Sequence, residues 1–230
     1  RSSKLDEIGV EHGFGTRHTL PITPTDVVFA KQVHGATFVR AEPGAARVEA
    51  DAIWTDRPGT AVGVVTADCV PILIAHESGR FVCAVHAGWR GSAARIAARS
   101  VQALVGETGC RAEELRAAIG PHIGPCCYEV GTEVVAIVRS AFPEAPDLLV
   151  PDGPDRARLD LLGANAVLLA RPGKREPDHR AGDRPTEWRA VPAGVAATSI
   201  VGSPGASRRA VAQGSSPRTE PPSRWAPGTS

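Results

Sequence analysis

The chain has 230 residues and a net charge of +1, so it lacks the basic surplus that supports non-specific binding to nucleic acid. No run of about eighteen apolar residues is present and no signal peptide is recognisable, so we expect neither a membrane span nor secretion. Five cysteines are an odd set that suits a reducing compartment, and we therefore expect a cytoplasmic protein.

The first half of the chain is rich in short β-type runs separated by turns. The first run alternates apolar residues with glycine and is expected at the edge of a sheet. In chain order, the expected strands are residues 9–17, 27–30, 36–40, 49–56, 60–66, 72–76, 81–85 and 115–119.

Three later segments have helical spacing of apolar residues, at 92–105, 134–142 and 159–170. Ser92 is a suitable N-cap for the first of them, and Pro143 ends the second. Residues 120–130 are too rich in Gly and Pro for regular structure, so we expect an irregular loop there.

The composition changes after residue 170. Residues 171–230 are dominated by Arg, Pro, Gly and Ser, with few aliphatic residues and no periodicity. Such a segment buries too little apolar surface to offset its ordering entropy, so we predict a folded domain over 1–170 and a disordered tail over 171–230. An out-of-frame tail and a genuine flexible tail both fit this composition.

The stretch 81–92 concentrates the groups that can do chemistry. It is predicted as a buried strand ending on His86, followed by a turn at Gly88 and Gly91 and a helix start at Ser92. Arg90 together with free N–H groups of that helix start would form an anion site. An ion pair of Arg90 with a surface carboxylate is the simpler alternative.

Three potential metal ligands, His34, Cys69 and His86, each stand at the end of a β-type run. Imidazole and thiolate suit zinc, and three protein ligands with one open position is the arrangement of catalytic zinc sites. A cysteine with two histidines also suits copper. Asp68 could orient a ligating histidine or cap a turn. Without further information, a loop histidine, a buried histidine and an inert thiol remain open alternatives.

Two further patterns limit the metal hypothesis. The sequence has neither a His-Glu-x-x-His motif nor the His-x-Glu and Pro-Cys-x-x-Cys pair of zinc nucleobase deaminases. Cys126 and Cys127 are adjacent, and adjacent side chains on an extended segment point apart. We therefore do not expect these two cysteines to chelate one ion together.

Five ordered motifs resemble those of the YfiH-like family, also called the polyphenol oxidase or laccase-domain family. They are residues 32–35 (QVHG), 49–52 (EADA), 66–71 (TADCVP), 86–91 (HAGWRG) and 119–131 (IGPHIGPCCYEVG). The resemblance covers about residues 8–166. It implies a single α/β domain with mixed sheets layered between helices. The closing strands of the family, with a Cys-Thr and a Ser-Tyr-Arg-Arg type motif, are missing here.

The resemblance implies that His34, Cys69 and His86 bind zinc and that the substrates are purine nucleosides and phosphate. The implied reactions are phosphorolysis of adenosine, inosine and methylthioadenosine and deamination of adenosine, with Arg90 near the phosphate. Copper-dependent oxidation of phenols is an alternative, although the chain offers few additional histidines. A cell-wall precursor hydrolase using Cys69 as nucleophile and an inactive remnant are further alternatives, and the oligomeric state stays open.

Overall fold

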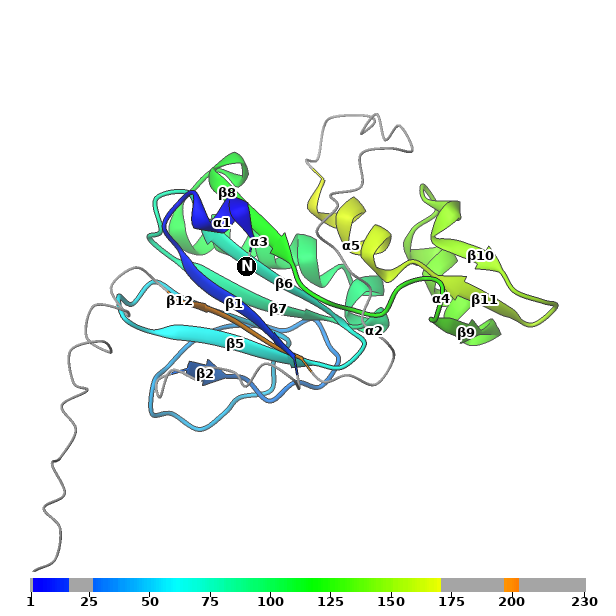
Figure 1. Ribbon diagram of the computed structural model, residues 1–230, viewed down its shortest axis with the longest axis horizontal. Helices are drawn as coiled ribbons and strands as arrows, with labels where there is room; N and C mark the ends of the chain where they lie inside the picture. The colour runs from blue at the N-terminus through cyan, green and yellow to red at the C-terminus, as the bar shows by residue number, and fades with distance from the viewer. Residues whose placement is uncertain (1, 17–26, 171–196, 203–230) are drawn as a thin grey trace, which may run out of the picture.

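The computed structural model of the chain describes residues 2–16, 27–170 and 197–202 (Figure 1). A four-stranded sheet and a five-stranded sheet lie face to face, and helices cover the outer face of the larger sheet. A small three-stranded sheet lies beside one helix at the end of the molecule (Figure 1). This mixed α/β architecture is the predicted fold class. No helix of the described residues is long and apolar enough to cross a membrane.

The five-stranded sheet supports the rest of the fold. Its strand order is β3-β4-β7-β6-β8, with β3 parallel to β4 and the other pairs antiparallel. The strands are β3 (Phe38–Arg40), β4 (Ala52–Thr55), β6 (Val70–His76), β7 (Val82–Ala87) and β8 (Leu115–Ile119).

Strands β6 and β7 are buried along their whole length, because both faces of the sheet are covered. In β6, Ile72 and Ile74 pack toward the helices, whereas Leu73 and Ala75 pack toward the second sheet. Successive side chains of a strand point to opposite faces, so a continuous apolar run is what a strand between two layers requires.

The smaller sheet has the order β1-β12-β5-β2. Its strands are β1 (Glu11–Thr16), β2 (Val27–Phe29), β5 (Ala61–Thr66) and β12 (Ala197–Gly202). Strand β12 pairs antiparallel with β1 on one side and with β5 on the other. The edge position predicted for the first strand is confirmed, since β1 closes one end of this sheet.

The helices are α1 (Ser3–Asp6), α2 (Trp89–Ala93), α3 (Ile96–Thr108), α4 (Thr132–Ala141) and α5 (Leu161–Leu169), with short 3₁₀ turns η1 (Ala112–Glu114) and η2 (Pro146–Leu148). Helices α3 and α5 pack on the larger sheet (Figure 1). The third sheet, ordered β10-β11-β9, consists of β10 (Leu149–Pro151), β11 (Arg156–Leu159) and β9 (Glu129–Gly131).

Two expectations fail against this architecture. Residues 197–202, predicted to lie in a disordered tail, form the inner strand β12, because the backbones of β1 and β5 provide hydrogen-bonding partners on both sides. The rest of the predicted tail lies outside the described residues. The helix expected at 92–105 is divided, because Arg95 adopts a left-handed backbone (φ 64°) between α2 and α3.

Candidate metal centre

The candidate site lies where the carboxyl end of β7 meets the amino ends of its antiparallel neighbours, β4 and β6. Continuing the register of these strands by one residue places Cys69 beside Gly88 and Asp51 beside His86. Two contacts agree with this placement. A Cβ atom built on Gly88 would lie 3.0 Å from Cys69 Sγ, and the His86 N–H donates to the Asp51 carbonyl oxygen at 2.7 Å.

His34 completes this group from the loop between β2 and β3. One ligand atom each of His34, Cys69 and His86 lies within 4.8 Å of the others. The His34 and His86 rings approach edge to face, with centroids 4.8 Å apart. His86 is buried, Cys69 is half-buried and His34 is exposed, so the group opens to solvent on the His34 side.

The Asp51 carboxylate organises this group and is fully buried. Its Oδ1 accepts from the His34 N–H at 3.0 Å and from His86 Nδ1 at 2.7 Å. Its Oδ2 accepts from the Gly35 N–H at 2.7 Å and from the Val33 N–H at 3.3 Å. One side chain thus fixes both the loop that carries His34 and the orientation of the His86 ring.

Asp51 belongs to the 49–52 motif without a predicted role, and Asp68 is the carboxylate expected to orient a histidine. For His86 that partner is Asp51. The sequence offers one signal: Asp51 is an acidic residue between two alanines, within the strand expected at 49–56. A carboxylate in such a position requires hydrogen-bond donors, since burying an unpaired charge is costly.

The His34 loop is held in an unusual backbone conformation. His34 has φ of 59°, in the left-handed region that residues other than glycine rarely adopt. The Asp51 hydrogen bonds restrain this conformation, and helix α2 packs closely behind it. A Cβ atom on Gly91 would lie only 2.8 Å from the Gly35 carbonyl oxygen, so α2 can approach the loop because residue 91 is glycine.

The protonation states follow from burial. Burial lowers the pKa of His86 and prevails over the opposing effect of Asp51, so the ring is neutral at physiological pH. Because Nδ1 donates to Asp51, the lone pair of Nε2 is free for a ligand. Burial, together with the charges of Asp68 and Asp51, raises the pKa of the Cys69 thiol to about 11.

These residues fit a zinc-type ion. Burial first, and then the charges of Asp68 and Asp51, raise the pKa of the Cys69 thiol, and a bound cation would offset both effects by stabilising the thiolate. Two imidazoles and one thiolate are donors that zinc accepts, with bonds of about 2.0–2.3 Å. The 4.8 Å span of the donor atoms is close to two such bonds. No other group of three potential ligands occurs in the parts of the chain that the structure describes.

Arg90 lies in α2, directly after the strand that carries His86. Its guanidinium stacks over the Trp89 ring at 4.3 Å, and it lines an open hollow of about 770 Å³ with residues of α4 that include Glu133. Its charge lowers the pKa of Tyr128, which burial first and then the Cys69 and Asp68 charges raise to about 12. The charges of Arg90 and Cys69 therefore both act on Tyr128, in opposite directions.

The predicted role of Ser92 is wrong. Helix α2 begins after Gly88, and the Ser92 N–H already donates to the Gly88 carbonyl oxygen at 2.8 Å. The Ser92 hydroxyl is buried and accepts from Asn165 Nδ2 of α5 at 2.8 Å. Ser92 therefore joins two helices, and its N–H cannot take part in the predicted anion site.

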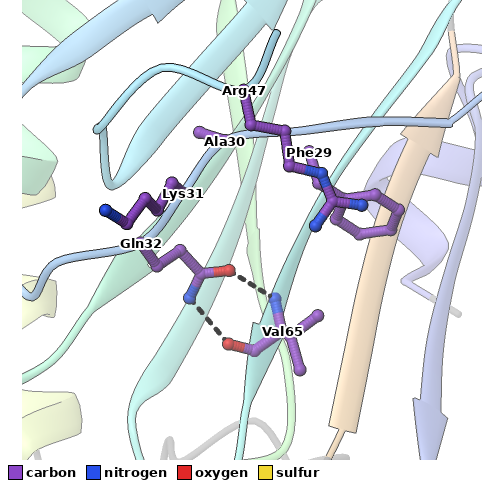
Figure 2. A pocket seen from close by; sticks show the side chains of 6 residues that line it. All are labelled: Phe29, Ala30, Lys31, Gln32, Arg47 and Val65. Atoms are coloured by element: carbon purple, nitrogen blue, oxygen red, sulfur yellow. Dashed lines mark hydrogen bonds between the residues drawn. The ribbon is translucent and has the colours of Figure 1, made fainter.

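Gln32 holds the start of the His34 loop in place (Figure 2). Beyond β2 the backbone no longer pairs with β5, and the side-chain amide of Gln32 hydrogen-bonds to the β5 backbone instead. Its Nε2 donates to the Val65 carbonyl oxygen at 2.7 Å, and its Oε1 accepts from the Val65 N–H at 2.8 Å. The residues around this pair line a surface cavity of about 460 Å³, where the Arg47 guanidinium lies against the Phe29 ring (Figure 2). Gln32 belongs to the 32–35 motif, but the sequence does not indicate its pairing with Val65.

Comparison with known proteins decides the family. The family model described as "Multi-copper polyphenol oxidoreductase laccase" matches residues 15–187. The chain belongs to the YfiH-like, or laccase-domain, family. The crystal structure of YlmD from Geobacillus stearothermophilus superposes with a TM-score of 0.64 and 28% identity, covering 79% of this chain and 74% of that one. The resemblance drawn from the five motifs is confirmed.

Two curated relatives carry names of nucleoside enzymes. "Purine nucleoside phosphorylase PA4543" of Pseudomonas aeruginosa is 41% identical over 150 residues, which are 62% of this chain and 60% of that protein. "Adenosine deaminase RL5" from an unknown prokaryotic organism is 38% identical over 133 residues, 57% of this chain and 50% of that protein. This YfiH-like chain therefore spans about half to three fifths of these relatives.

Replacing Gly88 with alanine is expected to weaken metal binding by this YfiH-like domain about tenfold, or ~1.4 kcal/mol. The new Cβ would lie 3.0 Å from Cys69 Sγ and 3.1 Å from His34 Nδ1, so both ligands would have to move. Competition with a chelator measures the affinity. Gly106→Ala in α3 is the matched control, because its Cβ meets nothing within 4 Å. Equal affinities in the two variants would contradict the crowding.

Proposed function

We propose that this YfiH-like chain is a zinc-dependent enzyme of purine nucleosides. Its reaction would be phosphorolysis of adenosine, inosine or methylthioadenosine to the free base and ribose 1-phosphate, with deamination of adenosine as a second activity. The names of PA4543 and RL5 support the substrate class. The observation that carries the proposal is the group of His34, Cys69 and His86, open on one side to solvent.

The residues have distinct parts in this proposal. His34, Cys69 and His86 would hold the ion, which when bound supplies a Lewis acid and a water of lowered pKa. Asp51 keeps the proton on His86 Nδ1, so that Nε2 faces the ion as a neutral donor. Arg90 would hold phosphate, because a guanidinium binds phosphate oxygens through two parallel hydrogen bonds.

Copper-dependent oxidation of phenols is the second candidate, favoured by the description of the family model. Reduction of oxygen by several electrons ordinarily needs several coupled coppers. Within the described residues only one group of three ligands is present. Three further histidines of the described residues do not belong to this group: His12, His76 and His122. A ring nitrogen of each is hydrogen-bonded to a residue two positions away in the chain. These observations support the nucleoside reaction over the oxidase.

A hydrolase with Cys69 as nucleophile receives less support. Nucleophilic cysteines have a lowered pKa, which keeps the thiolate populated at neutral pH. Burial raises the pKa of Cys69 to about 11 instead, so without a metal its thiol stays protonated at pH 7. A cation is what such a thiol requires to ionise, which again supports a metal ligand.

The deciding experiment combines metal content with a nucleoside assay. We expect about one zinc per chain by elemental analysis and phosphate-dependent release of base from adenosine or inosine. Cys69→Ala should lose both, whereas Cys110→Ala, which removes a buried thiol that is not among the candidate ligands, should keep both. Zinc retained at full occupancy in Cys69→Ala would refute the metal site. A zinc-loaded wild-type chain that cleaves no nucleoside would refute the activity while leaving the metal site standing.

Replacing Arg90 with leucine is expected to weaken the use of phosphate about ten- to two-hundredfold, since a hydrogen bond to a charged group contributes ~1.5–3 kcal/mol. Deamination uses water, so it should suffer less, and the zinc content should stay unchanged. The measurements are the apparent phosphate affinity in phosphorolysis and the rate of deamination. Arg95→Leu is the control, because Arg95 is an exposed arginine on the next helix start. An unchanged phosphate dependence in Arg90→Leu would remove Arg90 from the site.

A further inference from the structure

Cys126 and Cys127 are the reactive side chains that the proposed function does not use. All five cysteines of the chain are free thiols, and only these two are exposed. Cys83 and Cys110 are buried, and Cys69 belongs to the candidate metal centre. Outside the candidate metal centre, Cys126 and Cys127 are therefore the two thiols that small molecules in solution can reach.

The two sulfur atoms lie 3.0 Å apart. We expected adjacent side chains to point apart, as they do in an extended strand. That expectation is wrong, because residues 125–127 form a turn in which the Cys127 N–H donates to the Gly124 carbonyl oxygen at 3.0 Å. The turn brings both thiols together, and their hydrogen bond is the main reason why the pKa of Cys127 is raised.

The dithiol turn (residues 124–127) is tied to the fold on both sides. Before it, the Ile123 N–H donates to the Asp68 carbonyl oxygen at 3.0 Å, beside Cys69. Within it, the Arg158 guanidinium of β11 donates to the Cys126 carbonyl oxygen. After it, the Leu159 N–H donates to the Tyr128 carbonyl oxygen at 3.0 Å. The two thiols are thus held in contact before any reaction.

We propose that Cys126 and Cys127 are a site of reversible oxidation, which closes to a disulfide between the two neighbours by exchange with a small-molecule disulfide of the glutathione class. The support is contact between the sulfurs, exposure to solvent and anchorage of the turn. Little chain entropy is lost on closure, because the two sulfurs already touch. Neighbouring Cα atoms are only ~3.8 Å apart, below the usual Cα separation of disulfides, so the bridge is strained and is expected to be easily reduced. The proposal does not depend on zinc or on the nucleoside reaction.

The thiolate of one cysteine attacks a sulfur of the reagent, forming a mixed disulfide and expelling one thiolate, which takes up the proton released. The thiol of the second cysteine loses its proton and attacks the protein sulfur of that mixed disulfide. The reagent leaves as a second thiol. Two cysteines are oxidised, one disulfide is reduced to two thiols, and excess thiol reverses the reaction.

Trypsin separates the relevant cysteines cleanly. Cleavage after Arg116 and Arg139 yields peptide 117–139, which contains Cys126 and Cys127 and no other cysteine. The remaining three cysteines fall in peptides 48–80, 81–90 and 100–111. The full chain is treated with glutathione disulfide, unfolded, alkylated and digested. We expect peptide 117–139 to lose two hydrogens and both alkylation sites, to regain them after reduction, and the other peptides to be alkylated throughout.

Variants test the pairing. Cys126→Ser and Cys127→Ser should each stop at the mixed disulfide, leaving one glutathione on peptide 117–139, whereas Cys110→Ser should behave like the wild type. A stable glutathione adduct on the wild-type peptide would overturn the proposal. A cross-link of this peptide to 48–80 would do the same, because Cys69 would then be the partner. Full alkylation of both cysteines after treatment would show that the pair does not exchange at all.

Discussion

Replacing Asp51 with asparagine is expected to lower the stability of the metal-free chain by about 2–5 kcal/mol and to weaken metal binding ~10–100-fold. The two carboxylate oxygens accept from four donors: the N–H groups of residues 33, 34 and 35 and the His86 ring. An amide offers one oxygen only, so two of these donors would face an N–H₂ group in a buried site. Thermal unfolding and chelator competition give the two quantities.

Asp56→Asn is the matched control for this change. Asp56 directly follows β4, at the opposite end of the strand from Asp51, and its carboxylate pairs with Arg40 at the surface. Exposed ion pairs contribute little, so we expect a loss below about 1 kcal/mol and unchanged metal affinity. If Asp51→Asn were as stable as Asp56→Asn and bound metal equally well, the role assigned to the buried carboxylate would be wrong.

Replacing Ile200 with proline is expected to destabilise the chain by about 3 kcal/mol or more. Ile200 lies in the middle of β12, opposite Gly13 on one side and Gly63 on the other. A strand with neighbours on both sides uses every N–H in a ladder, so proline removes one hydrogen bond and fits poorly in the strand. In a chain of this size the loss corresponds to a fall in Tm of roughly 6–12 °C.

Ile200→Val is the matched control, because it keeps the N–H group and the β-branched shape. Its Tm should stay close to that of the wild type, within the ~0.5–1.5 kcal/mol range of such substitutions. Thermal unfolding followed by far-ultraviolet circular dichroism compares the variants. An Ile200→Pro chain that melts like Ile200→Val would mean that residues 197–202 do not hold the smaller sheet together.

Much of the fold could be predicted from local pattern. The apolar run at 70–76 has to lie between two layers, and the structure buries every residue of β6. The glycine-rich run that became β1 was predicted at an edge and lies there. Helix α4 overlaps the predicted range 134–142 and begins two residues before it, and helix α5 lies within the predicted range 159–170.

Other elements depend on partners that local sequence does not reveal. Strand β12 lies in a segment of weak intrinsic pattern and forms where two distant strands, β1 and β5, provide hydrogen bonds on both sides. The break between α2 and α3 depends on the left-handed Arg95. The contact of Cys126 with Cys127 depends on a turn, whereas the prediction that their side chains point apart assumed an extended segment.

The sequence by itself determined the family, through five ordered motifs, and indicated three candidate ligands, because imidazole and thiol side chains stand at the ends of β-type runs. Only the tertiary structure decided how they meet. The antiparallel register places Asp51 beside His86 and Cys69 beside Gly88, and the Asp51 carboxylate then draws in the loop that carries His34. The Asp51 side chain accepts from His34, 17 positions earlier in the chain, and from His86, 35 positions later. Strand pairing sets these contacts, and spacing along the chain does not encode them.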